Sequence, residues 1–414
     1  MRKFNIMVII IVSFLVLCGC NKNGVQPTEK DNPVKETVKL TVWGSDMDQG
    51  LLNEMVESFK VEHKDEAEFE ITVEVGNEDS CKERILEDVG ATADVFAFAD
   101  DQLMELVAAG VLEALEDDER IKAENSVGSV AAASINDEVY AYPMTADNGY
   151  FLYYNKKYLS EQEVGSFDQI LKVANNSNKK VVMDVTSGWY LYSFFGNTGL
   201  ELGLNSDGIT NHCNWNSTSE KIKGVDVGNA ILNITSNPAY KNGGDADFIE
   251  GAKNGTIIAG ISGIWSAEGL SEVWGSDFAA TKMPTYTVAG DQVQMSSYEG
   301  YKMIGVNAYS KEKEWAHQLA DWLTNEQNQV LRFEKRGLAP SNKVAASTEK
   351  IKQSPAIQAL TAQSEYAKLQ RVGAKYWGPA HQFGQALIDG KVSSRDMQQH
   401  MDTMVKEINQ KITE

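Results

Sequence analysis

Several aromatic side chains of this sequence stand beside carboxylates, a pairing that suits the binding of a sugar. Pyranose rings present aligned C–H groups that pack on aromatic faces. Their hydroxyls need hydrogen-bonding partners, because an unpaired buried polar group costs about 1–3 kcal/mol. The chain therefore predicts a site where rings stack on sugar and carboxylates bind its hydroxyls. The candidate residues are Phe98, Asp100, Asp101, Trp189, Tyr190, Tyr192, Trp265, Glu299 and Trp377.

Each candidate also has a structural interpretation that the sequence leaves open. Phe98 ends an apolar run and could pack in the core. Asp100 could cap a helix that begins near Gln102, a common role for aspartate at that position. Tyr190 and Tyr192 alternate with Leu191 and could pack on a strand face, and Trp377 could fill a contact between helices.

Catalytic and metal-binding motifs find little support. The five histidines form no H-E-x-x-H spacing, and G-x-S-x-G, G-x-x-x-x-G-K-[ST] and G-x-G-x-x-G are absent from the sequence. We expect no catalytic residue, no metal site and no cofactor. With 59 acidic residues, a carboxylate pair at glycosidase separation can arise by chance, so hydrolysis stays open as an alternative.

The elements that must position these residues alternate between strands and helices. Residues 38–43, 69–75 and 94–99 read as strands, with helical spacing between and after them, which predicts an α/β lobe with a parallel sheet. Ligands of such lobes bind beyond the carboxyl ends of the strands, which marks residues 43–46 and 98–101. Residues 166–261 repeat the alternation and predict a second lobe.

Residues 137–159 predict the crossing between the lobes. They read as a strand that ends at Pro143, a polar bend through residues 147–149, and an aromatic strand that ends near Asn155. An ordinary hairpin within one domain is the alternative. Further on, we expect a strand over 278–286, an exposed loop over 287–297 and a return strand over 298–306. Residues 315–336 are helical in period up to Gly337, and an almost wholly helical tail follows over 357–411.

The N-terminus and the charge predict where the protein works. Arg2 and Lys3 precede a short apolar run over residues 6–17, as in a secretory signal. Residues 21–37 are polar and read as a flexible tether. A net charge of −21 argues against nucleic acid as a partner. Cys81 and Cys213 are expected to be free thiols, with a single bridge as the alternative.

Residues 140–159, YAYPMTADNGYFLYYNKKYL, resemble the interlobe crossover of extracellular solute-binding proteins of carbohydrate ABC transporters. The order of the later motifs is similar to the maltose/maltodextrin-binding family. The resemblance implies a two-lobed periplasmic-binding-protein-like α/β fold, each lobe a sheet flanked by helices, with hinge crossovers and a helical C-terminal tail. The expected parts are a signal peptide (1–19), a tether (20–37), lobe 1 (38–146 plus 302–350) and lobe 2 (147–301 plus 351–414).

The same resemblance assigns roles at the site. Phe98 and Asp101 match an aromatic and an acid that bind sugar in this family, and Trp265 matches its principal stacking ring. Trp189 or Tyr190, together with Tyr192, matches an aromatic pair of the second lobe, and Trp377 matches a ring on the cleft. Asn148 stands where the family often has Glu, so we expect an amide contact there.

The resemblance also implies a function. The tetrad Leu17-Cys18-Gly19-Cys20 looks like a bacterial lipobox, which would place a lipid on Cys20. We therefore expect a monomeric lipoprotein on the extracellular face of the cytoplasmic membrane. It would bind malto-oligosaccharides and deliver them to the permease subunits of an ABC transporter. The alternatives are a binding protein for another oligosaccharide, a sensor or adhesin, and a surface glycoside-processing enzyme.

Overall fold

A computed structural model describes residues 35–90 and 92–411 of the chain. The predicted signal peptide, Cys20 and nearly all of the predicted tether lie outside the described residues. The residues Thr37–Glu414 cluster as one compact unit. Two five-stranded sheets organise this unit, and we call the parts built on them the first and second lobes.

The first sheet has the strand order β2-β1-β3-β17-β6. Its strands are β1 (Thr37–Gly44), β2 (Glu68–Val75), β3 (Val95–Ala99), β6 (Tyr142–Thr145) and β17 (Lys302–Val306). β1 pairs in parallel with β2 and β3, as the sequence predicts. β17 runs antiparallel to both of its neighbours, so the prediction of a parallel sheet is wrong for this edge. The reason is that β17 belongs to the chain that returns from the second lobe.

Apolar residues bury the centre of the first sheet, whereas its edge strand β2 has no buried residue. All five residues of β3, VFAFA, are buried, which is typical of a strand covered on both sides. Helix α1 (Gln49–Glu62) contributes Leu51, Leu52, Met55, Val56 and Phe59 to the core at helical spacing. Helix α11 (Lys313–Thr324) packs against α1 and β17.

The second sheet has the strand order β11-β8-β12-β7-β13. Its strands are β7 (Tyr150–Asn155), β8 (Lys180–Val182), β11 (Tyr240–Lys241), β12 (Ile257–Gly263) and β13 (Phe278–Thr281). Successive β7 side chains enter different cores, because side chains alternate along a strand. Tyr150, Leu152 and Tyr154 join one cluster, and Phe151 and Tyr153 join another.

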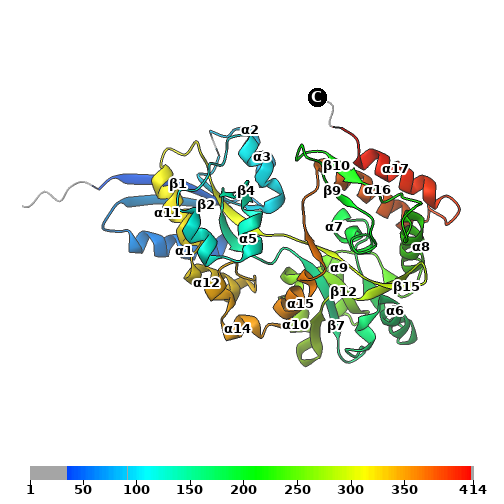
Figure 1. The fold of residues 1–414 in the computed structure, drawn as a ribbon. Coiled ribbons are helices and arrows are strands. Elements are labelled where there is room, and N and C mark those ends of the chain that lie inside the picture. Colours follow the sequence, from blue (N-terminus) through cyan, green and yellow to red (C-terminus); the bar gives the residue numbers. More distant parts are fainter. Residues whose placement is uncertain (1–34, 91, 412–414) are drawn as a thin grey trace, which may run out of the picture. The chain divides into compact units, whose positions relative to one another are not determined.

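Helices cover the second sheet and form much of the C-terminal part. α6 (Phe167–Asn176) packs on β8, and α9 (Asp245–Lys253) packs on β12. α15 (Pro355–Ser364) contacts β7 and β13. α16 (Trp377–Ile388) and α17 (Met397–Ile408) pack on each other and on α8 (Gly224–Thr235) (Figure 1).

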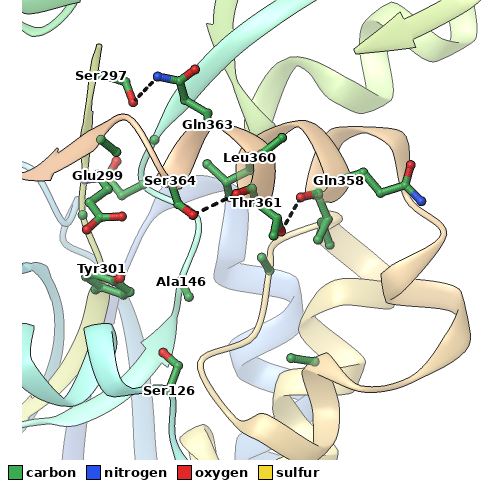
Figure 2. A pocket seen from close by; sticks show the side chains of 18 of the residues that line it. Ser126, Ala146, Ser297, Glu299, Tyr301, Gln358, Leu360, Thr361, Gln363 and Ser364 are labelled. Carbon is green, nitrogen blue, oxygen red and sulfur yellow. Dashed lines mark hydrogen bonds between the residues drawn. The ribbon is translucent and has the colours of Figure 1, made fainter. Parts of the chain in front are cut away.

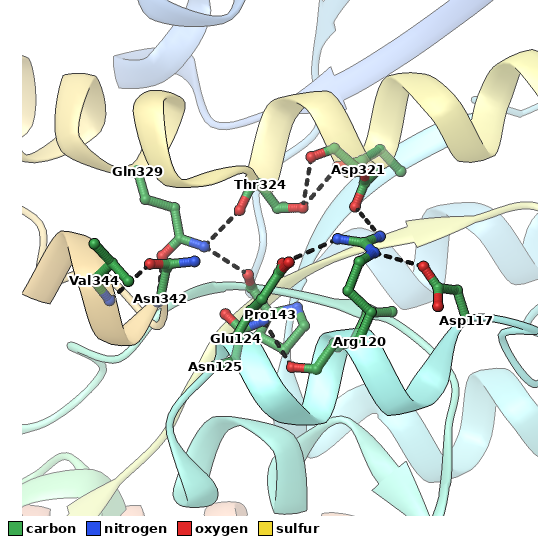
Figure 3. Close-up of polar contacts among 12 residues, drawn as sticks. Asp117, Arg120, Glu124, Asn125, Pro143, Asp321, Thr324, Gln329, Asn342 and Val344 are labelled. Atoms are coloured by element: carbon green, nitrogen blue, oxygen red, sulfur yellow. Dashed lines mark hydrogen bonds and ion pairs between the residues drawn. The ribbon is translucent and has the colours of Figure 1, made fainter.

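The chain passes from the first sheet to the second between β6 and β7, at the predicted crossover. The sequence predicts that this strand ends at Pro143, whereas in the structure it continues to Thr145. Proline is tolerated there because β6 is the edge strand of its sheet. The Gln329 amide donates to the carbonyls of Pro143, over 3.1 Å, and Thr324, over 2.6 Å (Figure 3). This buried side chain therefore holds the edge strand to the helices behind it.

The return half of the chain differs from the prediction in several places. The strands predicted over 278–286 and 298–306 are each two shorter strands, interrupted at residues 282–284 and 300–301. Residues 287–297 are not simply a loop, because β14 (Thr285–Val288) and β15 (Asp291–Gln294) form a hairpin. Its turn, Ala289-Gly290, has positive φ at both residues, which matches the twist of paired strands. The tail is interrupted by β18 (Ala367–Leu369), which pairs in parallel with β16 (Ser297–Glu299).

The long helical segment before Gly337 is two helices. α11 ends at Thr324, and α12 (Glu326–Arg336) begins after Asn325, whose side chain accepts the backbone N–H of Asn328. α12 ends, as predicted, at Gly337, whose φ of 70° lies in the left-handed region that glycine favours.

Candidate functional site

A cavity of about 720 Å³, which we call the cleft cavity, is lined by residues of both lobes. From the first lobe come residues that follow the strand ends. From the second lobe come three tryptophans, Trp189, Trp265 and Trp377. Rings and carboxylates thus reach one space from different sheets.

The acidic wall of the cleft cavity follows from the parallel strands of the first sheet. Asp46 follows β1, Glu78 and Asp79 follow β2, and Asp101 follows β3, and all four line the cavity. The carboxyl ends of parallel strands meet at one edge, which brings these side chains together. Sequence reasoning marked Asp46 and Asp101 by this rule but missed Glu78 and Asp79, although the end of the second predicted strand carried the same signal.

The ring of Trp265 is held in a fixed orientation. It lies in a single 3₁₀ turn, Ile264–Ser266, directly after β12. Its indole N–H donates to Asp245 Oδ2 over 2.8 Å, and Asp245 Oδ1 accepts from the Ser262 hydroxyl over 2.6 Å. A Cβ added to Gly263 would overlap the indole ring, so glycine is required beneath it. The arrangement holds an indole at the cavity wall before any ligand arrives.

Trp189 and Trp377 rest on a cluster of tyrosines. The Trp189 ring centroid lies 5.4 Å from that of Tyr150 and 5.3 Å from that of Tyr298. The Trp377 ring lies 4.9 Å from Tyr376. Tyr150 donates to the carbonyl of Trp189 over 2.7 Å, which fixes the start of α7 (Gly188–Leu191). The tyrosines therefore support the two half-buried tryptophan rings.

A buried ion pair underlies the first-lobe wall. Asp48, which also lines the cavity, pairs with the guanidinium groups of Arg332 and Arg336. Burial alone would raise the pKa of Asp48, but the two guanidinium groups outweigh it and hold that pKa below its usual value. The Asp48 carboxylate therefore binds these two arginines and not a ligand.

Lys302 is a cavity residue that sequence reasoning missed. It begins β17 and lines the cleft cavity, and its positive charge acts on Asp48 and Asp147. Within residues 35–90 and 92–411, the Lys302 ammonium forms no hydrogen bond with another side chain or with the backbone. A return-strand lysine gave no recognisable signal in the sequence, because its place depends on pairing with β3 and β6.

The structure brings some of the predicted site residues to this cavity and places others elsewhere. Those that line it are Asp101, Asn148, Trp189, Trp265 and Trp377. Those placed elsewhere are Phe98, Asp100, Tyr190, Tyr192 and Glu299.

Phe98, Tyr190 and Tyr192 pack within the protein. Phe98 lies inside β3 and is fully buried in the first-lobe core, so it packs there, as its structural interpretation allowed. Tyr192 stacks on Tyr298 with ring centroids 4.0 Å apart, and Tyr190 contacts Tyr150 at 4.9 Å. These two tyrosines belong to the cluster behind Trp189.

Asp100, which follows β3, is hydrogen-bonded to the backbone of Tyr301, the residue before β17. Its Oδ1 accepts the backbone N–H of Tyr301 over 2.9 Å, and its own N–H donates to the Tyr301 carbonyl over 3.0 Å. Its side chain makes no helix-capping hydrogen bond. Burial raises the pKa of Asp100 to about 7, and Oδ2 has no hydrogen-bonding partner among the described residues.

Glu299 lies in a different cavity, of about 660 Å³ (Figure 2). It follows Tyr298 in β16, and the parallel pairing of β16 with β18 positions this strand. Asn148 lines both cavities. The amide therefore reaches the cleft, whereas the carboxylate of Glu299 is not among the residues that line it.

The described residues contain neither a metal cluster nor a membrane-spanning helix. Residues 35–90 and 92–411 contain no group of three His, Cys, Asp or Glu side chains placed to hold a metal ion. Within these same ranges no helix has the length and apolar character needed to cross a membrane.

Comparison with known proteins agrees with this architecture. The family model for bacterial extracellular solute-binding proteins matches residues 54–359. A curated relative, the galactooligosaccharide-binding protein of Bacillus subtilis (strain 168), is 24% identical over 420 residues, which cover 95% of this chain and 94% of the relative.

Solved structures share the fold. One protein, solved with acarbose, superposes with a TM-score of 0.80 at 28% identity, covering 90% of this chain and 99% of the other. The unliganded maltodextrin-binding protein MalE1 of L. casei BL23 gives a TM-score of 0.76 at 22% identity, covering 91% and 100%. The two-lobed α/β fold with C-terminal helices, predicted from the sequence, is confirmed.

Proposed function

We propose that this chain, which belongs to the family of bacterial extracellular solute-binding proteins, binds malto-oligosaccharides in the cleft cavity and delivers them to the permease of an ABC transporter. The family is one of binding proteins, so the chain is a binding protein and not an enzyme. The proposal concerns which solute it binds, and where.

The observation that carries the proposal is the composition of the cleft cavity. Trp189, Trp265 and Trp377 offer apolar faces for several sugar rings. The carboxylates of Asp46, Glu78, Asp79 and Asp101 and the amide of Asn148 offer partners for hydroxyls. A neutral oligosaccharide needs both, because rings alone would leave its hydroxyls unpaired. The Lys302 ammonium, which also lines the cavity, would donate a hydrogen bond to a further sugar hydroxyl.

We further propose how binding produces a signal. Residues 38–146 plus 302–350 form lobe 1, and residues 147–301 plus 351–414 form lobe 2. A sugar that contacts tryptophans of one lobe and carboxylates of the other favours the conformation in which both reach it. The permease would then recognise this closed form.

The proposal includes a lipid anchor. Residues 1–19 would be removed, Cys20 would carry the lipid, and residues 20–37 would tether a monomeric binding unit to the outer face of the cytoplasmic membrane. Mass spectrometry of the protein from bacterial membranes tests this part, since a lipidated Cys20 gives a heavier N-terminal peptide.

A second candidate ligand is a galacto-oligosaccharide, which the curated relative is named for. The same cavity composition would serve it, because galactose also has an apolar face. Tightest binding of a galacto-oligosaccharide would keep the cleft assignment and change the sugar.

The test is calorimetric titration of residues 37–414 with maltotriose, a β-linked galactotriose, xylotriose and glucose, followed by analysis of the recovered sugar. We expect maltotriose to bind tightest and to be recovered intact. Binding of none of these sugars would contradict the function, and cleavage of the sugar would contradict a pure binding role.

A further inference from the structure

The cavity that Glu299 lines has Asn148 in common with the cleft cavity and is otherwise lined by different residues; we call it the hinge cavity. It has a volume of about 660 Å³. Its walls include Ala146, Asn148 and Gly149 from the segment that connects the two sheets, residues 297–301, which lead back to β17, and the helix α15. It is therefore built where the chain crosses between lobes.

The walls of the hinge cavity are largely apolar. Ala146 and Pro340 come from the first-lobe side, and Ile351, Ile357 and Leu360 come from the segment that leads into and forms α15. Figure 2 shows Leu360 and Thr361 of α15 across from Glu299 and Tyr301. A space of this size with such walls suits an apolar molecule of small-ligand dimensions.

Most polar side chains around the hinge cavity are already hydrogen-bonded within the protein. The Ser126 hydroxyl donates to that of Ser129 over 2.8 Å. Thr361 donates to the Ile357 carbonyl, and Ser364 donates to the Thr361 carbonyl, each over 2.8 Å (Figure 2). These groups have little remaining need for a ligand.

Glu299 and Tyr301 differ from these groups. Both are half-buried, and neither side chain has a hydrogen bond among those identified in the described residues. Both side chains line the same wall of the cavity, where Figure 2 shows them next to each other. Burial raises the pKa of Glu299 and that of Tyr301, and the Glu299 charge adds to the rise for Tyr301. The only cation lining the cavity within residues 35–411 is Lys352, which is exposed.

We propose that the hinge cavity is a second ligand site, for a small organic cation with an apolar body and a protonated amine. The ammonium would pair with the Glu299 carboxylate and donate to the Tyr301 hydroxyl oxygen. The apolar body would cover Leu360 and Pro340. Such a ligand supplies a cation to the half-buried Glu299 carboxylate, which forms no ion pair with Lys352 on the cavity wall.

The experiment uses residues 37–414, which form a compact unit with their own cores, without sugar present. Benzylamine and benzyl alcohol are titrated separately and followed by calorimetry and by amide chemical shifts. The two probes have nearly the same shape and differ in charge. We expect saturable benzylamine binding with a dissociation constant on the order of 1 mM, and benzyl alcohol to bind at least about tenfold more weakly.

Two glutamate variants locate the interaction. Glu299→Gln is expected to remove the advantage of the amine over the alcohol. Glu365→Gln, a matched change of an exposed glutamate at the end of α15, is expected to keep it. Ala146→Leu, which reduces the cavity volume, is expected to weaken both probes and decides the question if Glu299→Gln fails to fold.

Three results would overturn the proposal. They are the absence of saturable benzylamine binding, equal binding of both probes to the parent, and an advantage of the amine that survives in Glu299→Gln. Sugar binding is measured on the parent chain in a separate titration, so failure of the hinge site and failure of the proposed function are distinguishable.

Discussion

The indole N–H of Trp265 donates to Asp245 Oδ2 over 2.8 Å, across a separation of 20 residues. This bond connects the turn after β12 to the first turn of α9. The ring orientation is therefore set by the fold of the second lobe.

Trp265→Ala should weaken oligosaccharide binding by about 2 kcal/mol, roughly thirtyfold, because a large ring at the cavity wall is lost. Calorimetric titration with the preferred sugar measures the change. Tyr309→Ala is the control, since Tyr309 is 55% exposed and does not line the cleft cavity. Equal affinity of Trp265→Ala and the parent would refute the assignment of this ring.

Asp245→Ala should weaken the same binding by a smaller amount, about 1 kcal/mol or roughly fivefold, because the indole remains but loses its orienting bond. Asp247→Ala, on the same helix and exposed, is the matched control. A loss as large as that of Trp265→Ala would mean that Asp245 does more than orient the ring.

Asp48→Asn should destabilise the protein by about 3–5 kcal/mol, because it leaves the buried Arg332 without its charged partner. Arg332 Nε and Nη2 already lack partners among the described residues, so no other group compensates. Denaturant unfolding of the variant, with the exposed Asp389→Asn as control, measures the effect.

The cost of Asp48→Asn should also depend on pH. The folded-state pKa of Asp48 is lowered, so its contribution is complete above the unfolded-state value near 3.8 and is lost as the pH falls through the folded-state value. The difference in unfolding free energy between parent and variant should therefore shrink in strong acid. A difference that stays constant down to the lowest pH at which both fold would contradict this assignment.

The contribution of Asp100 to stability should depend on pH with the opposite sign to that of Asp48. Burial raises its folded-state pKa to about 7 from 3.8, with Arg371 opposing and Asp101 adding to the shift. The folded state then holds a proton that the unfolded state releases between these values, so stability falls as the pH rises from about 4 to 7. Asp100→Asn removes this titration and should gain stability relative to the parent over that range, as measured by unfolding at several pH values. No relative gain would contradict the shift.

Cys81 and Cys213 should not react with maleimide in the native protein. Both are free and buried, and burial raises the pKa of each thiol to about 12, which leaves little thiolate at neutral pH. Mass spectrometry of residues 37–414 should show no adduct until denaturant is added, and then adducts on both cysteines. Rapid native labelling would mean that one thiol is accessible.

The sequence predicted the elements with strong local signals. β3 was recognisable from its apolar run, and the crossover from its two strands around residues 147–149. Asp46 and Asp101 were found because the carboxyl ends of parallel strands are a general place for ligands. Trp265 and Trp377 reach the cleft cavity from a turn and a helix start, and it was the family resemblance that assigned both rings to the site.

The sequence could not predict contacts that depend on distant pairing. Glu299 was expected near sugar because tyrosines flank it, but β16 pairs with β18, about 70 positions further on, and Glu299 lies in the hinge cavity. Phe98 and Trp265 both occur near strand ends, yet Phe98 is still inside its strand and packs in the core. A shift of one or two residues at a strand end decides between core and cavity.

We expect the sugar to bind among Trp189, Trp265 and Trp377 in the cleft cavity. A crystal structure of residues 37–414 with the tightest-binding trisaccharide of the panel tests it most directly. We expect a sugar ring stacked on Trp265, with hydroxyls bonded to first-lobe carboxylates. Sugar bound in the hinge cavity, or on a surface away from these three rings, would contradict it.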